Sequence, residues 1–344
     1  MTIGLIGSGS WGTALVKILT DAQHRVTWCV RSEKIANHIR SRKQNPNYLS
    51  SVHFATDRLQ ITTDPEEVFR QSELIVLAVP SAYLGGYIEP IDPSLFANRL
   101  ILSAVKGILP RQNILLNEFL IQEKGLQPEQ YFTVMGPCHA EEVAAEKLSY
   151  LTFSGVDEVK TELVAAQFRT PYLNTVVNTD VYGVQYAAIL KNIYALGAGI
   201  AHGLEYGDNF LAVYIANAAD EMAGFLRKVG IRNIEVGVHT PEPFHQRKSP
   251  NYAASVYLGD LLVTCYSLFS RNRTFGNMIG KGYSVQSAQL ELNMVAEGYN
   301  ASKSIFRINQ ETRAEMPIAE AVYRILWEQE DPQAAFRSIE AGLN

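Results

Sequence analysis

The sequence predicts two domains: an α/β domain with a doubly wound, mostly parallel sheet over residues 1–180, and an all-α domain over residues 181–344. Three observations lead to this prediction. A chain of 344 residues exceeds what one hydrophobic core usually organises. In the first half, short β-rich apolar runs alternate with helical stretches, a pattern typical of parallel sheets. In the second half, long helical patterns dominate.

The strands of the first domain are expected where short apolar runs interrupt the helical pattern. We predict them at Ile3–Ile6, Arg25–Val30, Leu74–Val79, Leu100–Val105 and Tyr131–Met135, with Leu151–Phe153 and Thr175–Val177 as further edge strands near the junction. A helix is expected over Thr13–Ala22.

The second domain is expected to begin with a core helix. Its apolar run from Val184 to Ala201 is interrupted by Gln185, Lys191, Asn192 and two glycines. These polar residues make it a poor membrane span and a better helix of a globular core. The polar, proline-containing stretch Gly237–Pro250 predicts a surface loop.

Charge and cysteine content narrow the partners and the compartment. A net charge of −5 gives no electrostatic footprint for nucleic acid or an anionic membrane, so anionic ligands have to be bound by local lysines and arginines. Cys29, Cys138 and Cys265 have no C-x-x-C spacing and fit a reducing compartment. With no signal-peptide pattern at the N-terminus, we expect a cytoplasmic protein without stable membrane insertion.

A glycine-rich segment follows the first predicted strand. Gly7-Ser8-Gly9-Ser10-Trp11-Gly12 matches G-x-G-x-x-G and is followed directly by the predicted helix. Such glycines allow a tight turn, a close approach of the backbone to a pyrophosphate and close packing of helix on sheet. A simple glycine turn is the alternative, but the position between strand and helix favours a dinucleotide site in a Rossmann domain.

The residues after the second predicted strand bear on which dinucleotide binds. Where NAD enzymes often place an acidic residue for the ribose hydroxyls, this chain has Arg31-Ser32. An arginine can also stack on adenine or remain solvated. We expect NADP, or dual use of NADP and NAD.

Several charged residues stand in apolar surroundings. Lys191 lies in the apolar run of the second domain, where an ammonium is costly to bury unless it is paired. It either reaches water past a packed stem or lies in a polar pocket beside Asn192. Asp260 is a candidate partner for a buried lysine or a helix N-cap. Lys106 is expected at the carboxyl end of a strand, the ligand-binding edge of such sheets.

A further cluster, Ser270-Arg271-Asn272-Arg273, concentrates donors that suit a phosphate, although short basic clusters are usually solvated. No metal site is expected, because no carboxylate or cysteine near His239 and His245 completes a ligand set.

Ten motifs, in a fixed order along the chain, carry a resemblance to a known family. They are Gly7–Ala14, Ala78–Ser81, Lys106-Gly107, Gly136–Ala144, Leu190–Asn192, Gly203–Asn209, Gly259-Asp260, Ser270–Gly276, Val295–Tyr299 and Met316–Ile318. Through them the chain resembles the bacterial NAD(P)-dependent glycerol-3-phosphate dehydrogenases over nearly its full length. The resemblance implies reversible reduction of dihydroxyacetone phosphate to sn-glycerol 3-phosphate, a step that supplies glycerophospholipid synthesis.

The resemblance also implies roles for individual residues. Those along the cofactor are Gly7, Gly9, Ser10, Trp11, Gly12, Arg31, Lys106, Ala140, Arg271, Val295 and Glu297. Those around the phosphorylated triose are Lys106, Gly136, Cys138, Lys191, Asp260, Ser270, Arg271 and Asn272. Among them Lys191 is implied as the acid/base, with Lys106 and Asp260 as its catalytic partners. A homodimer is left open.

The chain departs from the family pattern at two places. Cys138 replaces the usual serine after Gly-Pro and is a weaker hydrogen-bond donor, and His139 replaces an apolar residue. The segment 231–257 is longer than expected. Two alternatives stand beside this dehydrogenase: an enzyme of the same architecture, of the 3-hydroxyacid or 6-phosphogluconate dehydrogenase type, and a non-catalytic NAD(P) sensor.

Overall fold

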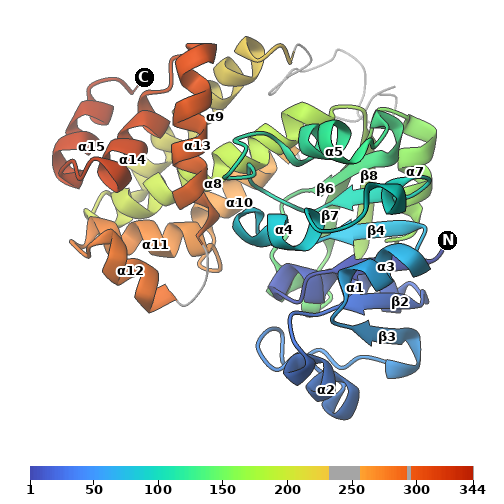
Figure 1. Cartoon of the computed structure of the whole chain (residues 1–344). Coiled ribbons are helices and arrows are strands. Elements are labelled where there is room, and N and C mark those ends of the chain that lie inside the picture. Colours follow the sequence, from blue (N-terminus) through green and yellow to red (C-terminus); the bar gives the residue numbers. More distant parts are fainter. Residues whose placement is uncertain (232–255, 293–295, 344) are drawn as a thin grey trace, which may run out of the picture. The chain divides into compact units, whose positions relative to one another are not determined.

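The computed structural model describes residues 1–231, 256–292 and 296–343 (Figure 1). The chain divides into two compact units, unit 1 at Met1–Val181 and unit 2 at Tyr182–Asn344. The predicted surface loop Gly237–Pro250 and the candidate cofactor residue Val295 lie outside the described residues.

Unit 1 is built on an eight-stranded sheet in the order β3-β2-β1-β4-β5-β6-β7-β8 (Figure 1). Neighbouring strands are parallel except β6 and β7, which are antiparallel. The strands are β1 (Ile3–Ile6), β2 (Val26–Cys29), β3 (Leu59–Thr62), β4 (Leu74–Leu77), β5 (Leu100–Ser103), β6 (Tyr131–Met135), β7 (Ser149–Ser154) and β8 (Leu173–Asn178). The predicted doubly wound, mostly parallel sheet is confirmed.

One strand was missing from the sequence prediction. β3 pairs with β2 at the edge of the sheet, and only its last residue, Thr62, is buried. Its sequence Leu-Gln-Ile-Thr has few apolar residues because an edge strand with one open side needs less of them. The run therefore did not stand out from the polar stretch around it.

The helices of unit 1 connect these strands, and polar N-caps start several of them. They are α1 (Ser10–Asp21), α2 (Glu33–Arg42), α3 (Pro65–Gln71), α4 (Ser81–Ile88), α5 (Leu116–Lys124), α6 (Ala140–Ala144) and α7 (Glu158–Ala166), with 3-10 turns η1 (Thr56–Arg58), η2 (Pro93–Phe96) and η3 (Pro128–Gln130). The side chains of Ser32, Asp64 and Asp157 each accept a hydrogen bond from an amide of the first helical turn.

Successive strand residues bury into two separate cores, one on each face of the sheet. Leu5 packs in one cluster with Trp28, whereas the next residue, Ile6, packs in the other with Cys29 and Leu77. Side chains alternate between the faces of a strand, so a sheet that is covered by helices on both sides needs apolar residues at every position.

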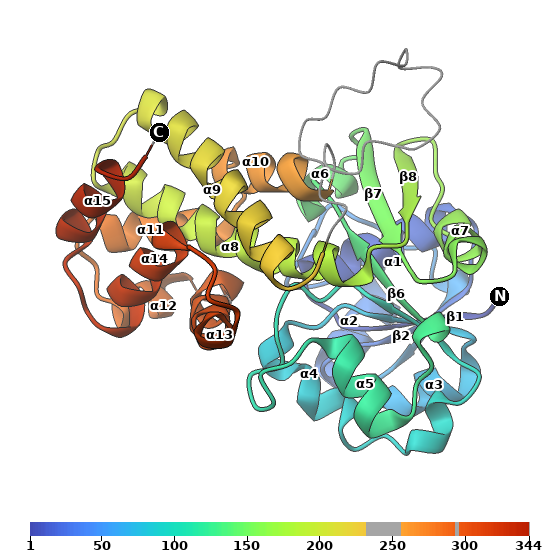
Figure 2. The same ribbon diagram turned by 90° about the horizontal axis from the view of Figure 1, so that it is seen from above.

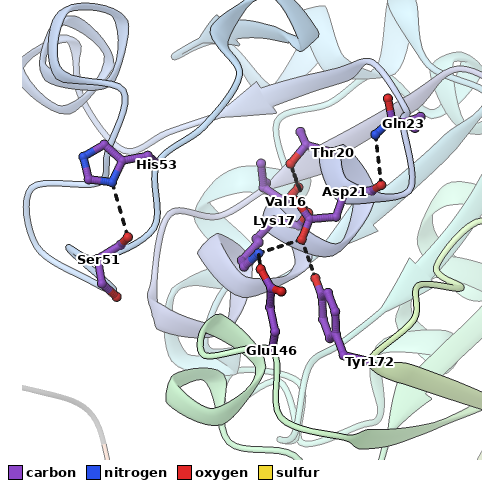
Figure 3. A network of polar contacts seen from close by, with 9 residues as sticks. All are labelled: Val16, Lys17, Thr20, Asp21, Gln23, Ser51, His53, Glu146 and Tyr172. Carbon is purple, nitrogen blue, oxygen red and sulfur yellow. Dashed lines mark hydrogen bonds and ion pairs between the residues drawn. The ribbon is translucent and has the colours of Figure 1, made fainter.

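A polar network fixes the second half of α1 (Figure 3). The Lys17 ammonium donates to Asp21 at 2.6 Å and to Glu146 at 2.9 Å, and the Tyr172 hydroxyl donates to Asp21 at 2.6 Å. Burial lowers the pKa of Lys17, but the hydrogen bonds to the two carboxylates outweigh it, so the pKa is raised. The network ties α1 to the chain after α6 and before β8.

The regular elements among the described residues of unit 2 are all helices (Figure 2). Its helices are α8 (Val181–Gly203), α9 (Asp208–Lys228), α10 (Leu258–Tyr266), α11 (Arg271–Gly280), α12 (Val285–Leu292), α13 (Glu297–Thr312), α14 (Pro317–Trp327) and α15 (Pro332–Glu340). The predicted core helix is α8, which lies beside α9: Tyr186 packs edge-on against Phe225, and the Tyr214 hydroxyl donates to the Tyr194 carbonyl at 3.0 Å.

Helices α8 and α11 contact each other through glycines. A Cβ atom built on Gly276 would collide with backbone atoms of Leu196 and Ile200. One built on Gly199 would collide with the Arg273 carbonyl. The two backbones therefore meet directly, which is possible because a glycine without a Cβ atom stands at each of these points of contact.

A buried carboxylate in α9 caps the start of α14. Glu221 is 7% exposed, and its two carboxylate oxygens accept from the amides of Ile318 at 2.8 Å and Ala319 at 3.0 Å. Burial raises its pKa to about 7, although these amide hydrogen bonds act in the opposite direction.

Candidate functional site

The carboxyl ends of β1 and β4 form the switch point of the sheet in unit 1. β1 pairs with β2 on one side and with β4 on the other. The chain that leaves β1 therefore continues to β2 on one side, and the chain that leaves β4 continues to β5 on the opposite side. Gly7 follows β1, and a Cβ on it would collide with the carbonyl of Ala78, which follows β4. Ligands of open α/β sheets bind at this kind of position.

The three glycines of the loop differ in what requires them. Gly7 has a φ of +131°, which disfavours any side chain, and a Cβ on Gly12 would approach the Gly7 carbonyl at 2.6 Å. A Cβ on Gly9, by contrast, would meet no atom within 4 Å. Nothing in the protein itself requires glycine there, so Gly9 fits the role of leaving room for a pyrophosphate.

The start of α1 is open to an anion. Its N-cap is Gly9, which has no side chain to cap the first amides. The unpaired amides and the helix dipole make such a helix start a binding site for phosphate groups. The residues of unit 1 therefore fit a dinucleotide.

The other cofactor candidates of unit 1 surround this helix start. The Ser10 hydroxyl donates to Glu141 at 3.2 Å, which links the loop to α6 and to the buried Ala140. The Lys106 ammonium lies 5.6 Å from the centre of the Trp11 ring. Arg31 is exposed after β2, and its amide donates to the Ser8 hydroxyl at 3.3 Å.

The segment after β6 adds a second tight turn to the same edge. Gly136 has a φ of +140°, and a Cβ on it would approach the Tyr150 carbonyl at 2.7 Å. The Cys138 thiol donates to that same carbonyl at 3.1 Å. The Cys138 thiol is thus directed at the backbone of β7 and is partly exposed.

In unit 2, Lys191 of α8 and Asp260 of α10 form a buried ion pair. Lys191 is 3% exposed and Asp260 is 1% exposed, so the lysine does not extend past a packed stem to water. Asp260 lies in the first turn of α10, whose N-cap is Tyr257, so it is not the N-cap. Its Oδ2 atom has no hydrogen-bond partner among the described residues. Of the two alternatives for Lys191, the structure therefore agrees with the one in which its ammonium is buried among polar groups.

Two asparagines extend this polar cluster. The Asn272 side-chain amide donates to the side-chain oxygen Oδ1 of Asn192 at 2.9 Å, and Asn272 Oδ1 accepts from the Gly298 amide at 2.9 Å. Both asparagines are buried. The direct contact of α8 with α11 brings Asn272 to Asn192, the residue that follows Lys191. The sequence indicated Asn192 as a polar neighbour of Lys191 but did not indicate its partner.

The candidate phosphate cluster occupies the start of α11. Ser270 is the buried N-cap and accepts from the Arg273 amide at 3.3 Å, whereas Arg271 is exposed in the first turn. Glu297 begins α13, one residue before Gly298. The serine, arginine and helix start thus lie together, as a phosphate site needs.

Sequence reasoning missed the residues that support the glycine loop. Trp28, Asn45 and Thr13 each donate to one of its carbonyls. Asn45 lies in an irregular polar stretch after α2, where no pattern separates it from its neighbours.

Two further properties concern the described residues as a whole. In residues 1–231, 256–292 and 296–343, no group of three or more histidine, cysteine or acidic side chains is placed to hold a metal ion; His239 and His245 lie outside these ranges. Within the same ranges, no helix is both long and apolar enough to cross a membrane.

Comparison with known proteins identifies relatives over nearly the whole chain. Residues 2–160 match the family model of the NAD-dependent glycerol-3-phosphate dehydrogenase N-terminus, and residues 180–337 match that of its C-terminus. The glycerol-3-phosphate dehydrogenase [NAD(P)+] of Chlorobium luteolum is 33% identical over 329 residues, covering 95% of this chain and 94% of that protein. Enzyme 2 of the same name from Salinibacter ruber is 34% identical over 333 residues, covering 96% and 92%.

Solved structures agree with these relatives. The crystal structure of glycerol-3-phosphate dehydrogenase from Coxiella burnetii superposes with a TM-score of 0.86 at 26% identity and covers 98% of both chains. The resemblance seen in the sequence motifs is confirmed. The chain belongs to the NAD-dependent glycerol-3-phosphate dehydrogenase family.

Proposed function

We propose that this protein is an NAD(P)-dependent glycerol-3-phosphate dehydrogenase that reversibly reduces dihydroxyacetone phosphate to sn-glycerol 3-phosphate, as the names of its relatives state for those proteins. The observation that carries the proposal is the buried pair of Lys191 with Asp260 in a chain of this family. An ion pair with side chains 4% and 2% exposed costs desolvation and adds little stability, so a chemical role accounts for it best.

The two halves have separate roles in this proposal. Residues 1–180 form the dinucleotide-binding domain, and Gly7, Gly9 and Gly12 shape the loop for the pyrophosphate. The cofactor is contacted by Ser10, Trp11, Lys106 and Ala140, and its adenosine end by Arg31. The remaining cofactor-binding residues in this proposal are Arg271, Val295 and Glu297. Bound NAD(P)H supplies the hydride. Residues 181–344 form the substrate and catalytic domain.

Lys191 is the acid/base of the proposed reaction. Its ammonium polarises the C2 carbonyl of dihydroxyacetone phosphate and gives a proton to the oxygen as the alkoxide develops. Asp260 orients the ammonium and balances its charge. In the direction of glycerol 3-phosphate oxidation, the neutral amine takes the hydroxyl proton back.

Positively charged and polar groups hold the substrate phosphate. Arg271 and Asn272, at the start of α11, donate to the phosphate oxygens, and the helix dipole adds to their attraction. Ser270 supports the same turn as its N-cap. Lys106 adds positive potential, and Gly136 and Cys138 line the substrate.

The direct test follows NADPH or NADH absorbance with purified protein and dihydroxyacetone phosphate. We expect oxidation that depends on this substrate, faster with NADPH if Arg31 binds the 2′-phosphate. Lys191→Ala is expected to lose turnover and keep cofactor binding. The matched control is Lys124→Met: Lys124 is also buried but donates only to carbonyls of Glu89 and Ile91. Lys124→Met should keep kcat.

The outcomes separate the proposal from its alternatives. Cofactor binding without turnover of any phosphorylated triose would indicate an NAD(P) sensor. Turnover of a 3-hydroxyacid or of 6-phosphogluconate instead would indicate the related dehydrogenases. A Lys191→Ala enzyme that retains most of its kcat would remove Lys191 from the mechanism.

We propose a cytoplasmic enzyme whose product supplies glycerophospholipid synthesis. Its small-molecule partner is the phosphorylated triose, and nucleic acid is not a partner. Light scattering of the purified protein will show whether it is the homodimer left open by the sequence.

A further inference from the structure

Three consecutive carbonyls of the glycine loop each accept a hydrogen bond from a side chain. Trp28 Nε1 donates to the Gly7 carbonyl at 2.8 Å. Asn45 Nδ2 donates to the Ser8 carbonyl at 3.0 Å, and Thr13 Oγ1 donates to the Gly9 carbonyl at 2.8 Å. All three side chains are completely buried. The carbonyls of the loop are therefore held toward the protein interior.

Asn45 connects this set to the rest of unit 1. The same Nδ2 group also donates to Thr13 Oγ1 at 2.8 Å, so both of its hydrogens are used. The Asn45 oxygen accepts from the Asn47 amide at 2.9 Å. Only a side-chain amide of this size offers two donors and an acceptor together. An aspartate would direct lone pairs at the Ser8 carbonyl, and a leucine would leave that carbonyl unpaired.

We infer that Asn45 is a positioning residue for the dinucleotide, acting through the loop that binds it. By engaging the Ser8 carbonyl directly and the Gly9 carbonyl through Thr13, Asn45 keeps these negative dipole ends from turning toward the pyrophosphate. The amides at the start of α1 then remain the groups presented to the phosphates. This inference rests on the proposed NAD(P)H binding, but not on which substrate is reduced.

The test compares Asn45→Asp and Asn45→Leu with the wild type by calorimetric titration of NADPH. Loss of a hydrogen bond that leaves a buried carbonyl unpaired is expected to raise the Kd by about tenfold or more. The KM for NADPH should rise in parallel, while kcat at saturating cofactor and the KM for dihydroxyacetone phosphate stay near the wild-type values.

A matched control separates positioning from general stability. Asn309 is also buried; its side-chain amide donates to the Ala314 carbonyl at 3.0 Å, and its oxygen accepts from the Ala314 amide at 2.9 Å. Asn309→Asp breaks equivalent hydrogen bonds outside the glycine loop. It should lower Tm and leave the Kd for NADPH unchanged. An Asn45→Asp protein that binds NADPH with wild-type affinity would overturn the inference.

A second pair of variants covers the case in which the Asn45 variants do not fold. Thr13→Ser keeps the hydroxyl that joins Asn45 to Gly9, whereas Thr13→Val keeps the shape and removes it. Weaker NADPH binding in Thr13→Val alone supports the inference, and equal affinities contradict it. Failure of the proposed function looks different, because the wild type would then bind NADPH without reducing dihydroxyacetone phosphate.

Discussion

The ion pair of Lys191 and Asp260 allows a quantitative test of what the buried charges cost. Their side chains are 4% and 2% exposed, so neither charge reaches water when its partner is removed. Lys191→Met leaves a buried carboxylate, and Asp260→Leu leaves a buried ammonium. Each single substitution should lower the free energy of unfolding by about 3–5 kcal/mol. The double variant leaves no charge and should be close to the wild type, so the coupling energy between the two substitutions should be about 6–10 kcal/mol, the sum of the two single costs.

The measurement is urea unfolding of the four proteins, followed by circular dichroism of the helical signal, together with kcat for each. We expect the double variant to regain stability without regaining turnover, because the apolar pair cannot polarise a carbonyl. Single substitutions that each cost under about 1 kcal/mol and add up in the double variant would refute the reasoning. They would mean that water reaches these side chains.

Three further outcomes are expected. Burial raises the pKa of Glu221 to about 7, so this carboxyl group holds its proton more tightly in the native state than in the unfolded chain. The contribution of Glu221 to the free energy of unfolding therefore falls as the pH rises from 4.5 through 7. Glu221→Gln should be less stable than the wild type by about 1–3 kcal/mol at pH 5, since one α14 amide loses its acceptor, and the difference should shrink by pH 8 in urea titrations. Gly276→Ala should cost about 2 kcal/mol or more by the same assay and reduce kcat, because its Cβ meets backbone, whereas Gly224→Ala in α9, with no atom within 4 Å, should gain about 0.5–1 kcal/mol. Lys17→Met should cost about 1 kcal/mol at pH 7, a modest value because Glu146 is 60% exposed, and calorimetry should show this difference disappearing as the pH rises above 10.5 toward the raised pKa of Lys17.

The sequence predicted the fold wherever apolar periodicity was strong. The central strands are buried on both faces and appear as continuous apolar runs, and the long apolar stretch of α8 is a helix at the core of unit 2. Even β7 and β8, the parallel pair at the far side of the sheet, were placed by their apolar centres at Leu151–Phe153 and Thr175–Val177. Burial leaves a clear trace in sequence because it acts on every residue of such a segment.

The candidate site was predicted less completely. Lys191 and Asp260 stood out as single charges among apolar neighbours, and the structure pairs them. Asn45 and Glu221 did not stand out, since each makes at least one of its hydrogen bonds to a backbone group that is distant along the chain. Backbone amides and carbonyls are the same in almost every residue type, so no pattern in the sequence indicates which of them a distant side chain contacts.

The glycine contact between α8 and α11 has a consequence for how this enzyme tolerates genetic change. Every single-nucleotide missense change of a glycine codon adds a side chain, and at Gly199 and Gly276 that side chain would meet backbone that cannot swing aside. Gly199 lies about two helical turns from Asn192 on α8, and Gly276 lies about one turn from Asn272 on α11. Deep mutational scanning should therefore find these two glycine codons as intolerant as that of Lys191, although neither Gly199 nor Gly276 has a part in the proposed reaction.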